Sequence, residues 1–409
     1  MKKILNSAFL ALALLMLSSC NNEKNTASDT PNEAENLIAE VRQEYAPDKR
    51  VALFDIEAEE NKDTYILKGE SNLPEAVENL KEKLKSQNIN FKDSIQILPE
   101  EEMANSKGVI KISVANLRGD AAHSSELVTQ ATLGMPVNVY KKNSNWYLIQ
   151  TPDDYLAWVD GGGVQIYSEE EFKDWKASEK LIYLQPSGNS FAEANTNSEV
   201  VSDLVAGDIL ELTGTENGFF KVEYPDGRTA YIQQKEGKKY KEWLQNLDPE
   251  GEDLIATSRK LMGLPYLWGG TSPKGVDCSG YTKTIYFLNG IVIPRDASQQ
   301  VHTGKLVDST RNFENLVPGD LLFFGRPATD STSERVVHVG MWIGNNEFIH
   351  SSGRVHISSM DKNAENFDQG NYDRYLRTKR LLNQQGEGLT YLRKKDIFTT
   401  DAASAEASE

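Results

Sequence analysis

The stretch "GTSPKGVDCSGYTKTIYF" (residues 270–287) contains one of only two cysteines in 409 residues. After Cys278, apolar side chains recur with helical spacing at Tyr281 and Ile285, and a glycine stop follows, so we expect a helix that begins at the cysteine. The free N–H groups and the dipole of a helix N-terminus stabilise a thiolate or an oxyanion. Cys278 is therefore a candidate nucleophile, and the alternative is a buried small apolar side chain.

Two histidines supply a candidate base. His338 and His350 lie in "VVHVGMWIGNNEFIH" (336–350), which predicts two strands around a Gly-Asn-Asn turn. Because they are twelve residues apart, both point to one face of the hairpin, opposite or diagonal to each other. His338 can accept the thiol proton while His350 orients it, unless they are satisfied core histidines. Tyr266 precedes the cysteine by twelve residues and is a candidate oxyanion donor.

A metal site is a rival use of the same residues. Cys278, His338 and His350 could form a three-ligand zinc site, with His356 close by in sequence. Short ligand spacings such as C-x-x-C or H-x-x-x-H are absent from the sequence, however. The sequence therefore predicts a nucleophile and its base rather than a metal site, and no other cofactor.

The other cysteine, Cys20, closes a targeting segment. "MKKILNSAFLALALLMLSSC" (1–20) has two lysines, a short apolar run and small residues before the cysteine, as in a signal peptide. "LSSC" resembles the bacterial lipoprotein cleavage box, which implies cleavage before Cys20 and lipidation of its sulfur; the alternative is an ordinary secretory signal. We expect an exported lipoprotein, anchored to a membrane and facing the periplasm or the cell surface. Residues 21–32 are expected to form a polar stalk.

Net charge narrows the possible partners. The formal charge is −17 at pH 7 and 39% of residues are hydrophobic, which predicts an acidic protein of two to four domains. This negative charge argues against nucleic acid and anionic lipid head groups as binding partners, so the lipid anchor is the expected membrane contact. With Cys20 lipidated, Cys278 has no disulfide partner in the chain.

The N-terminal part and the tail carry weaker signals. Residues 33–106 alternate helical and strand patterns and predict a small α+β domain without evident chemistry. Residues 386–409 are expected to form a C-terminal tail. The sequence is silent on the role of the first domain and on the oligomeric state.

An internal repeat lies between these parts. A shift of 73 residues aligns "VTQATLGMPVNVYKKNSNWYLIQTPDDYLAWVD" (128–160) with "VSDLVAGDILELTGTENGFFKVEYPDGRTAYIQ" (201–233) without a gap. Short alternating strands with Gly, Asn, Asp and Pro turns predict two small β-barrels, at residues 108–166 and 181–236. Both copies resemble bacterial SH3 domains.

Several motifs in order identify the last domain by resemblance. "YLWGGTSPKGVDCSG", "PRDASQQ", "VPGDLLFF" and "HVGMWIG…FIHSSG" together resemble the NlpC/P60 cysteine peptidases, which share a papain-like core. The resemblance covers about residues 250 to 385, and we place the domain at 248–385. It implies that Cys278 is the nucleophile, His338 the base, His350 the third member and Tyr266 an oxyanion contributor. The expected fold class is multidomain α+β.

Two preceding SH3-like domains are similar to the branch of γ-D-glutamyl-L-diamino acid endopeptidases, also called dipeptidyl-peptidase VI. That resemblance implies cleavage of the γ-D-Glu–diamino acid bond in murein stem peptides with a free N-terminal L-Ala. The product would be L-Ala-γ-D-Glu from peptidoglycan fragments, with lysine or meso-diaminopimelate as the third residue.

A free ammonium requires carboxylates. Asp277 and Asp296 are candidates in the peptidase domain, with Ser279 as a hydroxyl. In similar enzymes the first SH3-like domain supplies an acid and a tyrosine, and the matching positions are Glu126 and Tyr155. The second copy has an arginine in place of that tyrosine, so only the first copy keeps the pair. Relatives often carry serine after the aspartate of "PRDAS", where this chain has alanine.

Two other functions are compatible with the sequence. An endopeptidase acting on intact, cross-linked wall is expected if the SH3-like domains only anchor the enzyme and leave the cleft open. A non-catalytic lipoprotein that binds wall peptides is expected if the peptidase domain is a relic, although all three members of the predicted triad are present.

Overall fold

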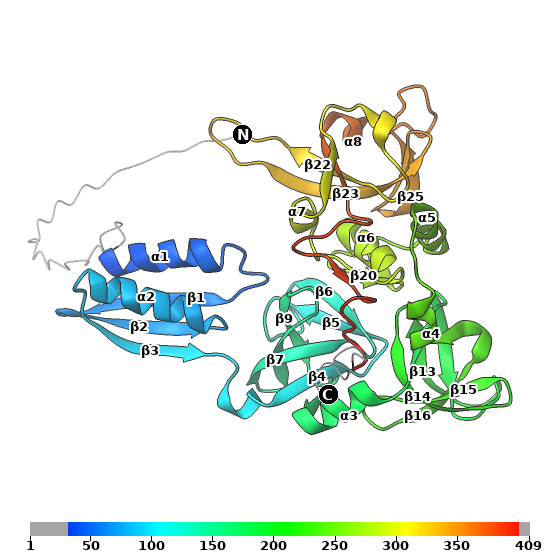
Figure 1. The fold of residues 1–409 in the computed structure, drawn as a ribbon, viewed down its shortest axis with the longest axis horizontal. Helices are drawn as coiled ribbons and strands as arrows, with labels where there is room; N and C mark the ends of the chain where they lie inside the picture. The colour runs from blue at the N-terminus through cyan, green and yellow to red at the C-terminus, as the bar shows by residue number, and fades with distance from the viewer. Residues whose placement is uncertain (1–31, 401–409) are drawn as a thin grey trace, which may run out of the picture.

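The computed structural model describes residues 32–400 and contains four packed units (Figure 1). Cys20, the predicted signal peptide and most of the predicted stalk lie outside the described residues. Within the described part, no helix is both long and apolar enough to cross a membrane.

The first unit is a small α+β domain, as the sequence predicts. It comprises α1 (Glu33–Tyr45), β1 (Phe54–Asn61), β2 (Thr64–Ser71), α2 (Pro74–Ser86) and β3 (Phe91–Ile97). Strand β1 pairs antiparallel with β2, and β2 pairs parallel with β3 through the crossover helix α2. Both helices cover one face of the sheet, where Ile38, Leu80 and Ile56 are fully buried (Figure 1). The short helix η1 (Glu101–Met103) leads to the next unit.

The internal repeat is confirmed strand by strand. Five strands of the first copy recur 73 residues later with identical bounds, a sixth differs by one residue at its start, and two register shifts recur as well. The first copy contains β4 (Ser106–Ile110), β5 (Val114–Arg118), β6 (Leu127–Thr132), β7 (Pro136–Asn143), β8 (Trp146–Gln150), β9 (Leu156–Asp160) and β10 (Val164–Ser168). Helix α3 (Glu169–Ala177) connects it to β11 (Lys180–Tyr183), β12 (Ser187–Phe191), β13 (Val200–Val205), β14 (Ile209–Glu216), β15 (Phe219–Glu223), β16 (Thr229–Gln233), η2 (Gln234–Glu236) and β17 (Gly237–Lys239) of the second.

Neither copy is a closed barrel, which corrects the sequence-based expectation. The strand order is β10-β4-β7-β8-β9-β5-β6 in the first copy and β13-β12-β16-β15-β14-β11-β17 in the second. Each is an open, seven-stranded sheet because its terminal strands do not pair with each other. The free edge of the first copy is β6, and its residues hydrogen-bond instead with the peptidase domain.

Equivalent turns of the two copies dock on each other. Leu133 accepts a hydrogen bond from the Ile209 N–H at 2.9 Å and donates its own N–H to Asp208 Oδ1 at 3.2 Å. The next residue, Gly134, has φ +78°, and a Cβ at this position would lie 2.0 Å from the Ile209 carbonyl oxygen. Only glycine fits this contact between the two copies.

The peptidase domain is built on a six-stranded sheet of order β21-β26-β22-β23-β24-β25. Helix α6 (Cys278–Phe287) packs on this sheet, and Tyr281 and Ile285 are buried against Phe323, Met341 and Ile349. The other elements are α4 (Tyr240–Gln245), α5 (Gly251–Lys260), β18 (Thr271–Ser272), β19 (Gly275–Val276), β20 (Ile291–Val292), α7 (Ala297–Gln300), β21 (Lys305–Asp308), η3 (Phe313–Asn315), β22 (Leu321–Arg326), β23 (Arg335–Gly344), β24 (Glu347–Ser352), β25 (Arg354–Ser359), α8 (Gln369–Asp373) and β26 (Tyr375–Arg380).

Much of the predicted C-terminal tail is packed, which is a second correction. Strand β27 (Thr390–Tyr391) pairs with β20, and Leu392 and Phe398 are fully buried. Phe398 packs edge-on against Tyr240 and at a tilt against Phe287, which belong to the helices α4 and α6. Residues 386–400 therefore clasp the peptidase domain to the second SH3-like copy, because their apolar side chains fill the seam between the two.

The docked turns predict a site-specific loss of stability. We expect Gly134→Ala to lower the free energy of unfolding by about 3 kcal/mol, from a disfavoured backbone conformation and a clash with the second copy. Gly218→Ala is the matched control, because Gly218 has φ +81° but faces open space. The control should cost only about 1 kcal/mol. Urea unfolding of both variants measures the difference, and equal losses would contradict a tight contact at Gly134.

Candidate active site

Cys278 is the first residue of α6, as the sequence predicts. Asp277 caps the helix, and its Oδ1 accepts the Gly280 N–H at 2.7 Å. The thiol is buried, with 8% of the residue exposed, and it lies against the backbone N–H groups of Val339 and Ser279. Val339 directly follows His338 in β23, so the helix and strand bring the two predicted catalytic side chains into one region.

Burial determines the charge of the thiol in the unliganded protein. It raises the pKa of Cys278 to about 11, and the negative charge of Asp277 adds to the rise. The N–H groups of Val339 and Ser279 act in the opposite direction but do not cancel it. The sequence suggested a thiolate stabilised by the helix terminus, whereas the enclosed site holds a neutral thiol that must lose its proton during attack.

His338, His350 and Ser358 form a hydrogen-bonded chain across three strands. His338 Nε2 lies 2.7 Å from His350 Nδ1, and His350 Nε2 lies 3.1 Å from the Ser358 hydroxyl. Burial lowers the pKa of His338 to about 3 and that of His350 to about 2, so both rings are neutral at pH 7. If His338 Nε2 donates to His350, then His350 Nε2 donates to Ser358, and His338 Nδ1 is left as a proton acceptor.

This arrangement suits a base better than a metal ligand set. The facing nitrogens of His338 and His350 share one proton and cannot both bind a metal ion at that point. No group of three or more His, Cys, Asp or Glu side chains placed to hold a metal ion occurs within residues 32–400. The sulfur of Cys278 makes no hydrogen bond to His338 among these described residues, and such contacts commonly tighten only when substrate binds.

Tyr266 lies beside the nucleophile region. Its backbone forms a bridge with Val276, two residues before the cysteine. Burial, together with the nearby charges of Cys278 and Asp277, raises the pKa of its phenol to about 12. The hydroxyl is therefore protonated at neutral pH and can donate a hydrogen bond to an oxyanion.

Asp277 does not have the role predicted for it. Arg295, which is 1% exposed, donates to Asp277 Oδ2 at 2.6 Å and to Oδ1 at 3.2 Å. The Gly269 and Gly280 N–H groups also donate to this carboxylate, so it has no room for a substrate ammonium. Ser279, predicted to bind substrate, accepts a hydrogen bond from Arg295 at 3.1 Å and is buried.

The first SH3-like copy forms one wall of the site through strand β6. The Thr271 N–H donates to Gln130 Oε1 at 3.0 Å, and the Thr271 hydroxyl donates to the Gln130 carbonyl at 2.9 Å. The predicted substrate residue Glu126, exposed just before β6, accepts a hydrogen bond from Trp268 Nε1 at 2.6 Å. Trp268 is 65% exposed and belongs to the loop before the nucleophile. The wall is therefore joined to the peptidase domain beside Cys278.

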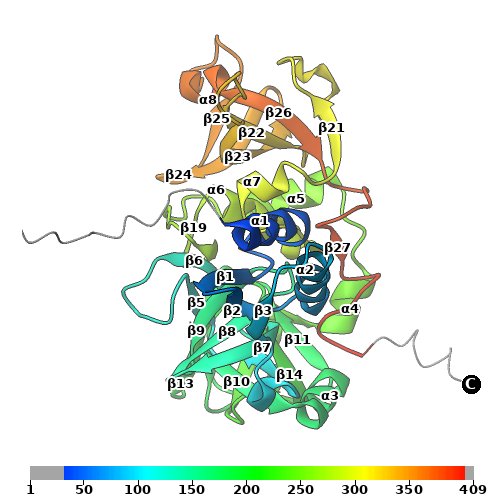
Figure 2. The ribbon, with the colours of Figure 1, turned by 90° about the vertical axis from the view of Figure 1, so that its left-hand side faces the viewer.

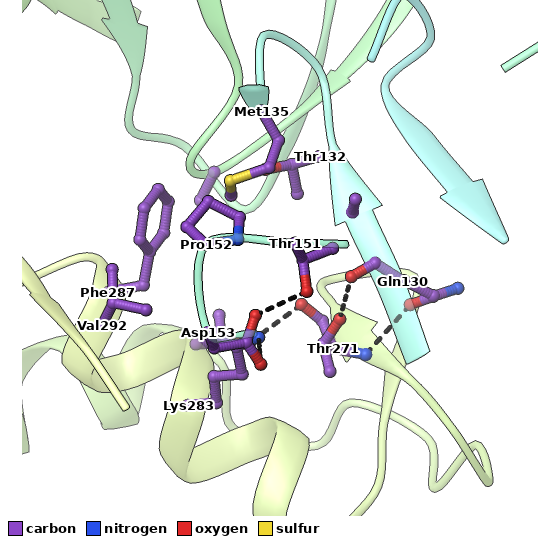
Figure 3. Close-up of a pocket in the computed structure, with 13 residues that line it drawn as sticks. Gln130, Thr132, Met135, Thr151, Pro152, Asp153, Thr271, Lys283, Phe287 and Val292 are labelled. Atoms are coloured by element: carbon purple, nitrogen blue, oxygen red, sulfur yellow. Dashed lines mark hydrogen bonds and ion pairs between the residues drawn. The ribbon is translucent and has the colours of Figure 1, made fainter. Parts of the chain in front are cut away.

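Figure 3 shows the neighbouring part of this junction, where the side chain of Lys283 on α6 approaches Asp153 of the first copy. Their charged atoms are 2.6 Å apart, and both side chains are largely buried. These two residues help to line a cavity of about 40 Å³, which is room for a few water molecules. This space is a structural seam and is too small for a peptide substrate.

Asp296 is the point where three units meet. Its Oδ2 accepts the Tyr155 hydroxyl of the first copy at 3.2 Å and Arg50 Nη1 of the N-terminal domain at 2.8 Å. Tyr155 is 5% exposed, and burial together with the charge of Asp296 raises its pKa, so the phenol is a donor. The predicted Tyr155 and the predicted carboxylate Asp296 are thus in contact, whereas Glu126, the acid predicted together with Tyr155, contacts Trp268 of the peptidase domain.

Sequence reasoning missed three residues of the site. Arg295 belongs to the "PRDAS" motif, and its position directly before the candidate carboxylate Asp296 could have indicated it. Ser358 lies on the strand after His350, two residues beyond His356, and alternation along that strand could have indicated it. Arg50 lies in a loop of the first domain, 246 residues from its partner Asp296, and no sequence signal connects the two.

Comparisons with known proteins identify the domains of the chain. The model of the NlpC/P60 family matches residues 263–370, and that of the bacterial SH3 domain matches 113–165 and 191–238. The γ-D-glutamyl-L-lysine dipeptidyl-peptidase of Bacillus cereus is 34% identical over 246 residues, 56% of this chain and 68% of that protein. A protein of the same name from Bacillus subtilis is 30% identical over 231 residues, 54% of this chain and 71% of that protein.

A solved structure of the same family has a similar fold. An NlpC/P60 family protein from Bacillus cereus superposes with a TM-score of 0.57 at 26% identity, covering 68% of this chain and 99% of that chain. The fold and the site define a cysteine peptidase. The chain belongs to the NlpC/P60 family and carries two bacterial SH3 domains.

The raised pKa of the thiol predicts a steep pH dependence of alkylation. Because the thiolate is the reactive form, the rate of Cys278 alkylation by iodoacetamide should rise about tenfold for each pH unit between pH 6 and 9.5. Mass spectrometry of the unliganded protein measures the rate, with a simple thiol as the reference. A rate that is already constant at pH 6 would indicate a preformed thiolate–imidazolium pair instead.

The hydrogen bond between His350 and Ser358 predicts that loss of the Ser358 hydroxyl slows turnover. We expect Ser358→Ala to lower kcat of the peptidase about tenfold with little change in KM, because His350 loses the partner that fixes its tautomer. Ser358→Thr keeps a hydroxyl on a strand and should restore most of kcat. Steady-state kinetics of both variants measure the effect, and equal activity of Ser358→Ala and the natural protein would remove Ser358 from the chain.

Proposed function

We propose that this protein hydrolyses the γ-D-Glu–L-diamino acid bond of murein stem peptides that carry a free N-terminal L-Ala, releasing L-Ala-γ-D-Glu during the degradation and recycling of peptidoglycan fragments. The named activity of its Bacillus relatives supports the bond. The requirement for a free amine rests on the partly exposed carboxylate of Asp296, which accepts a hydrogen bond from Tyr155 of the first SH3 domain and can bind an ammonium group.

In the proposed first step, His338 Nδ1 takes the Cys278 proton as the sulfur attacks the γ-carbonyl carbon of D-glutamate. Negative charge develops on the carbonyl oxygen, where the N–H of Cys278 and the Tyr266 hydroxyl can donate to it. The C–N bond then breaks as His338 returns its proton to the leaving amine. The products of this step are a thioester on Cys278 and the free diamino acid part.

In the second step, His338 Nδ1 takes a proton from water while the water oxygen attacks the thioester carbon. The C–S bond breaks, His338 returns the proton to sulfur, and L-Ala-γ-D-Glu leaves. His350 and Ser358 hold the His338 ring in the required tautomer throughout, as argued from their hydrogen bonds.

The wall formed by the first SH3 domain favours small fragments over polymer. Strand β6 and the Trp268–Glu126 contact border the loop before Cys278, so we expect protein to limit how far a substrate extends on this side. A stem peptide that ends in a free amine at Asp296 fits such a blind end, whereas an amidated glycan attachment at the same nitrogen removes the charge and adds bulk. We also propose export and anchoring through Cys20, which lies outside the described residues.

The decisive experiment compares two peptides. Protein lacking residues 1–20 is incubated with L-Ala-γ-D-Glu-L-Lys or its N-acetylated twin, and products are identified by mass spectrometry. We expect cleavage of the free-amine peptide at least about 100-fold faster, because a desolvated carboxylate discriminates strongly against a neutral amide. Cys278→Ala should abolish the reaction.

The other possible outcomes distinguish between the two alternative functions. Equal cleavage of both peptides would favour an endopeptidase that remodels intact wall. Binding of either peptide without cleavage would favour a non-catalytic wall-peptide-binding protein. A third peptide with meso-diaminopimelate in place of lysine identifies the preferred third residue.

A further inference from the structure

The N-terminal domain reaches the candidate amine site through one loop. The loop between α1 and β1 contacts the first SH3 domain, where the Leu156 N–H donates to the Arg50 carbonyl at 2.7 Å. Gln150 Nε2 donates to the Val51 carbonyl at 3.1 Å. These contacts fix the loop against the turn that carries Tyr155. In Figure 2 the N-terminal domain lies in front of this region, between the SH3 strands and α7.

The side chain of Arg50 is held before it reaches the site. Asp48 accepts its Nε at 2.8 Å and its Nη2 at 2.7 Å, a two-pronged pairing. The remaining nitrogen, Nη1, donates to Asp296 Oδ2 at 2.8 Å and to the Ser298 hydroxyl at 3.0 Å. Gln299 donates to Asp48 at 2.9 Å, so the pair is also anchored on α7. Arg50 is therefore oriented from its own domain and points one N–H pair at Asp296.

The charges of the cluster leave Asp296 uncompensated. Burial raises the pKa of Asp48, but the hydrogen bonds from Arg50 outweigh this effect and lower the pKa below its usual value. In the same way, Asp48 raises the pKa of Arg50 against the opposing effect of burial. Asp48 cancels the charge of Arg50 in this pair, and Asp277 cancels that of Arg295 in the same two-pronged way. Three carboxylates and two guanidinium groups leave one negative charge, which falls on Asp296. The cluster is complementary to one monocation.

The carboxylate of Asp296 also keeps room for such a ligand. Its Oδ2 is occupied by Arg50 and Tyr155, and the carboxylate also faces the Gln299 N–H as the N-cap of α7. Oδ1 is 3.8 Å from the nearest nitrogen of Arg295, beyond hydrogen-bond reach. The side chain is 26% exposed, so a substrate group can reach it. One oxygen thus fixes the orientation of the carboxylate, and the other can accept from an ammonium.

We propose that the N-terminal α+β domain takes part in amine recognition, and that Arg50, held by Asp48, is the positioning residue that orients Asp296 toward the substrate ammonium. This inference rests on the proposed function, because the ammonium belongs to the free N-terminal alanine. Arg50 acts through Asp296 and fixes its geometry, while Asp48 prevents Arg50 from neutralising the site.

The test measures KM and kcat separately in the full chain without residues 1–20. Arg50→Ala should raise KM for L-Ala-γ-D-Glu-L-Lys about tenfold with kcat changed less than about threefold, because binding of the ammonium loses its oriented acceptor. Arg50→Lys can donate to Asp296 but loses the fork with Asp48, so it should restore KM partly. Asp48→Asn should also raise KM, most at low salt, because Arg50 then cancels the charge of Asp296.

Glu70→Ala is the matched control. Glu70 pairs with Lys141 at 2.5 Å and joins the same N-terminal domain to the first SH3 domain away from Asp296. This variant should leave KM unchanged, and equal melting temperatures of the Glu70→Ala and Arg50→Ala proteins show that domain docking is equally preserved.

The outcomes separate this inference from the proposed function. If the natural protein cleaves the free-amine peptide and its N-acetylated twin equally, the amine site itself is wrong and the role of Arg50 falls with it. If the natural protein prefers the free amine but Arg50→Ala leaves KM unchanged, the loop is only a domain clasp. A lower KM in Arg50→Ala would mean that Arg50 competes with the ammonium, and this result would also overturn the proposal.

Discussion

The buried pair of Arg295 and Asp277 is the interaction on which the rest of the site depends. Asp277 caps the helix that begins at Cys278, and Arg295 joins that cap to Ser279 and, through Nε at 3.0 Å, to Thr129 of the first SH3 domain. A guanidinium with 1% exposure is tolerated only when paired and hydrogen-bonded, and loss of one partner of such a pair costs about 3–5 kcal/mol. One ion pair therefore couples the start of the nucleophile helix to the docking of a separate domain.

Domain docking gives the site its shape. The open edge of the first SH3 sheet contacts the loop before Cys278, and the loop of the N-terminal domain supplies Arg50 to Asp296, the carboxylate that Tyr155 of the first SH3 domain also contacts. The second copy contributes differently, since its turn at Gly207 packs on Phe287 at the end of α6, and its Asp203 pairs with Lys274 in the loop before the nucleophile. Both SH3 domains thus support α6 and the loop that precedes it.

Local patterns in the sequence predicted most of the elements and the central chemistry. The helix at Cys278, the hairpin that carries His338 and His350, and the 73-residue repeat each depend on residues close together in the chain. In that hairpin, Asn345 and Asn346 both have positive φ, as a tight turn of this kind requires, so the turn itself sets the register. The closed barrels were wrong because edge pairing involves distant partners, and residues 386–400 of the predicted tail are packed because Leu392 and Phe398 are buried among residues far away in the sequence.

The sequence by itself determined most of the secondary structure, the repeated SH3 domains and the NlpC/P60 resemblance, and it named Cys278 and His338 as the candidate nucleophile and base, because spacing and residue type express these features locally. Only the tertiary structure decided the electrostatics. Burial makes the thiol of Cys278 and the ring of His338 neutral, although a helix terminus alone favours the thiolate. It also showed that the hydrogen bonds of Asp277 are saturated, whereas Asp296 is partly exposed. Desolvation and pairing depend on every group within a few ångströms, and the chain supplies those groups from positions hundreds of residues apart.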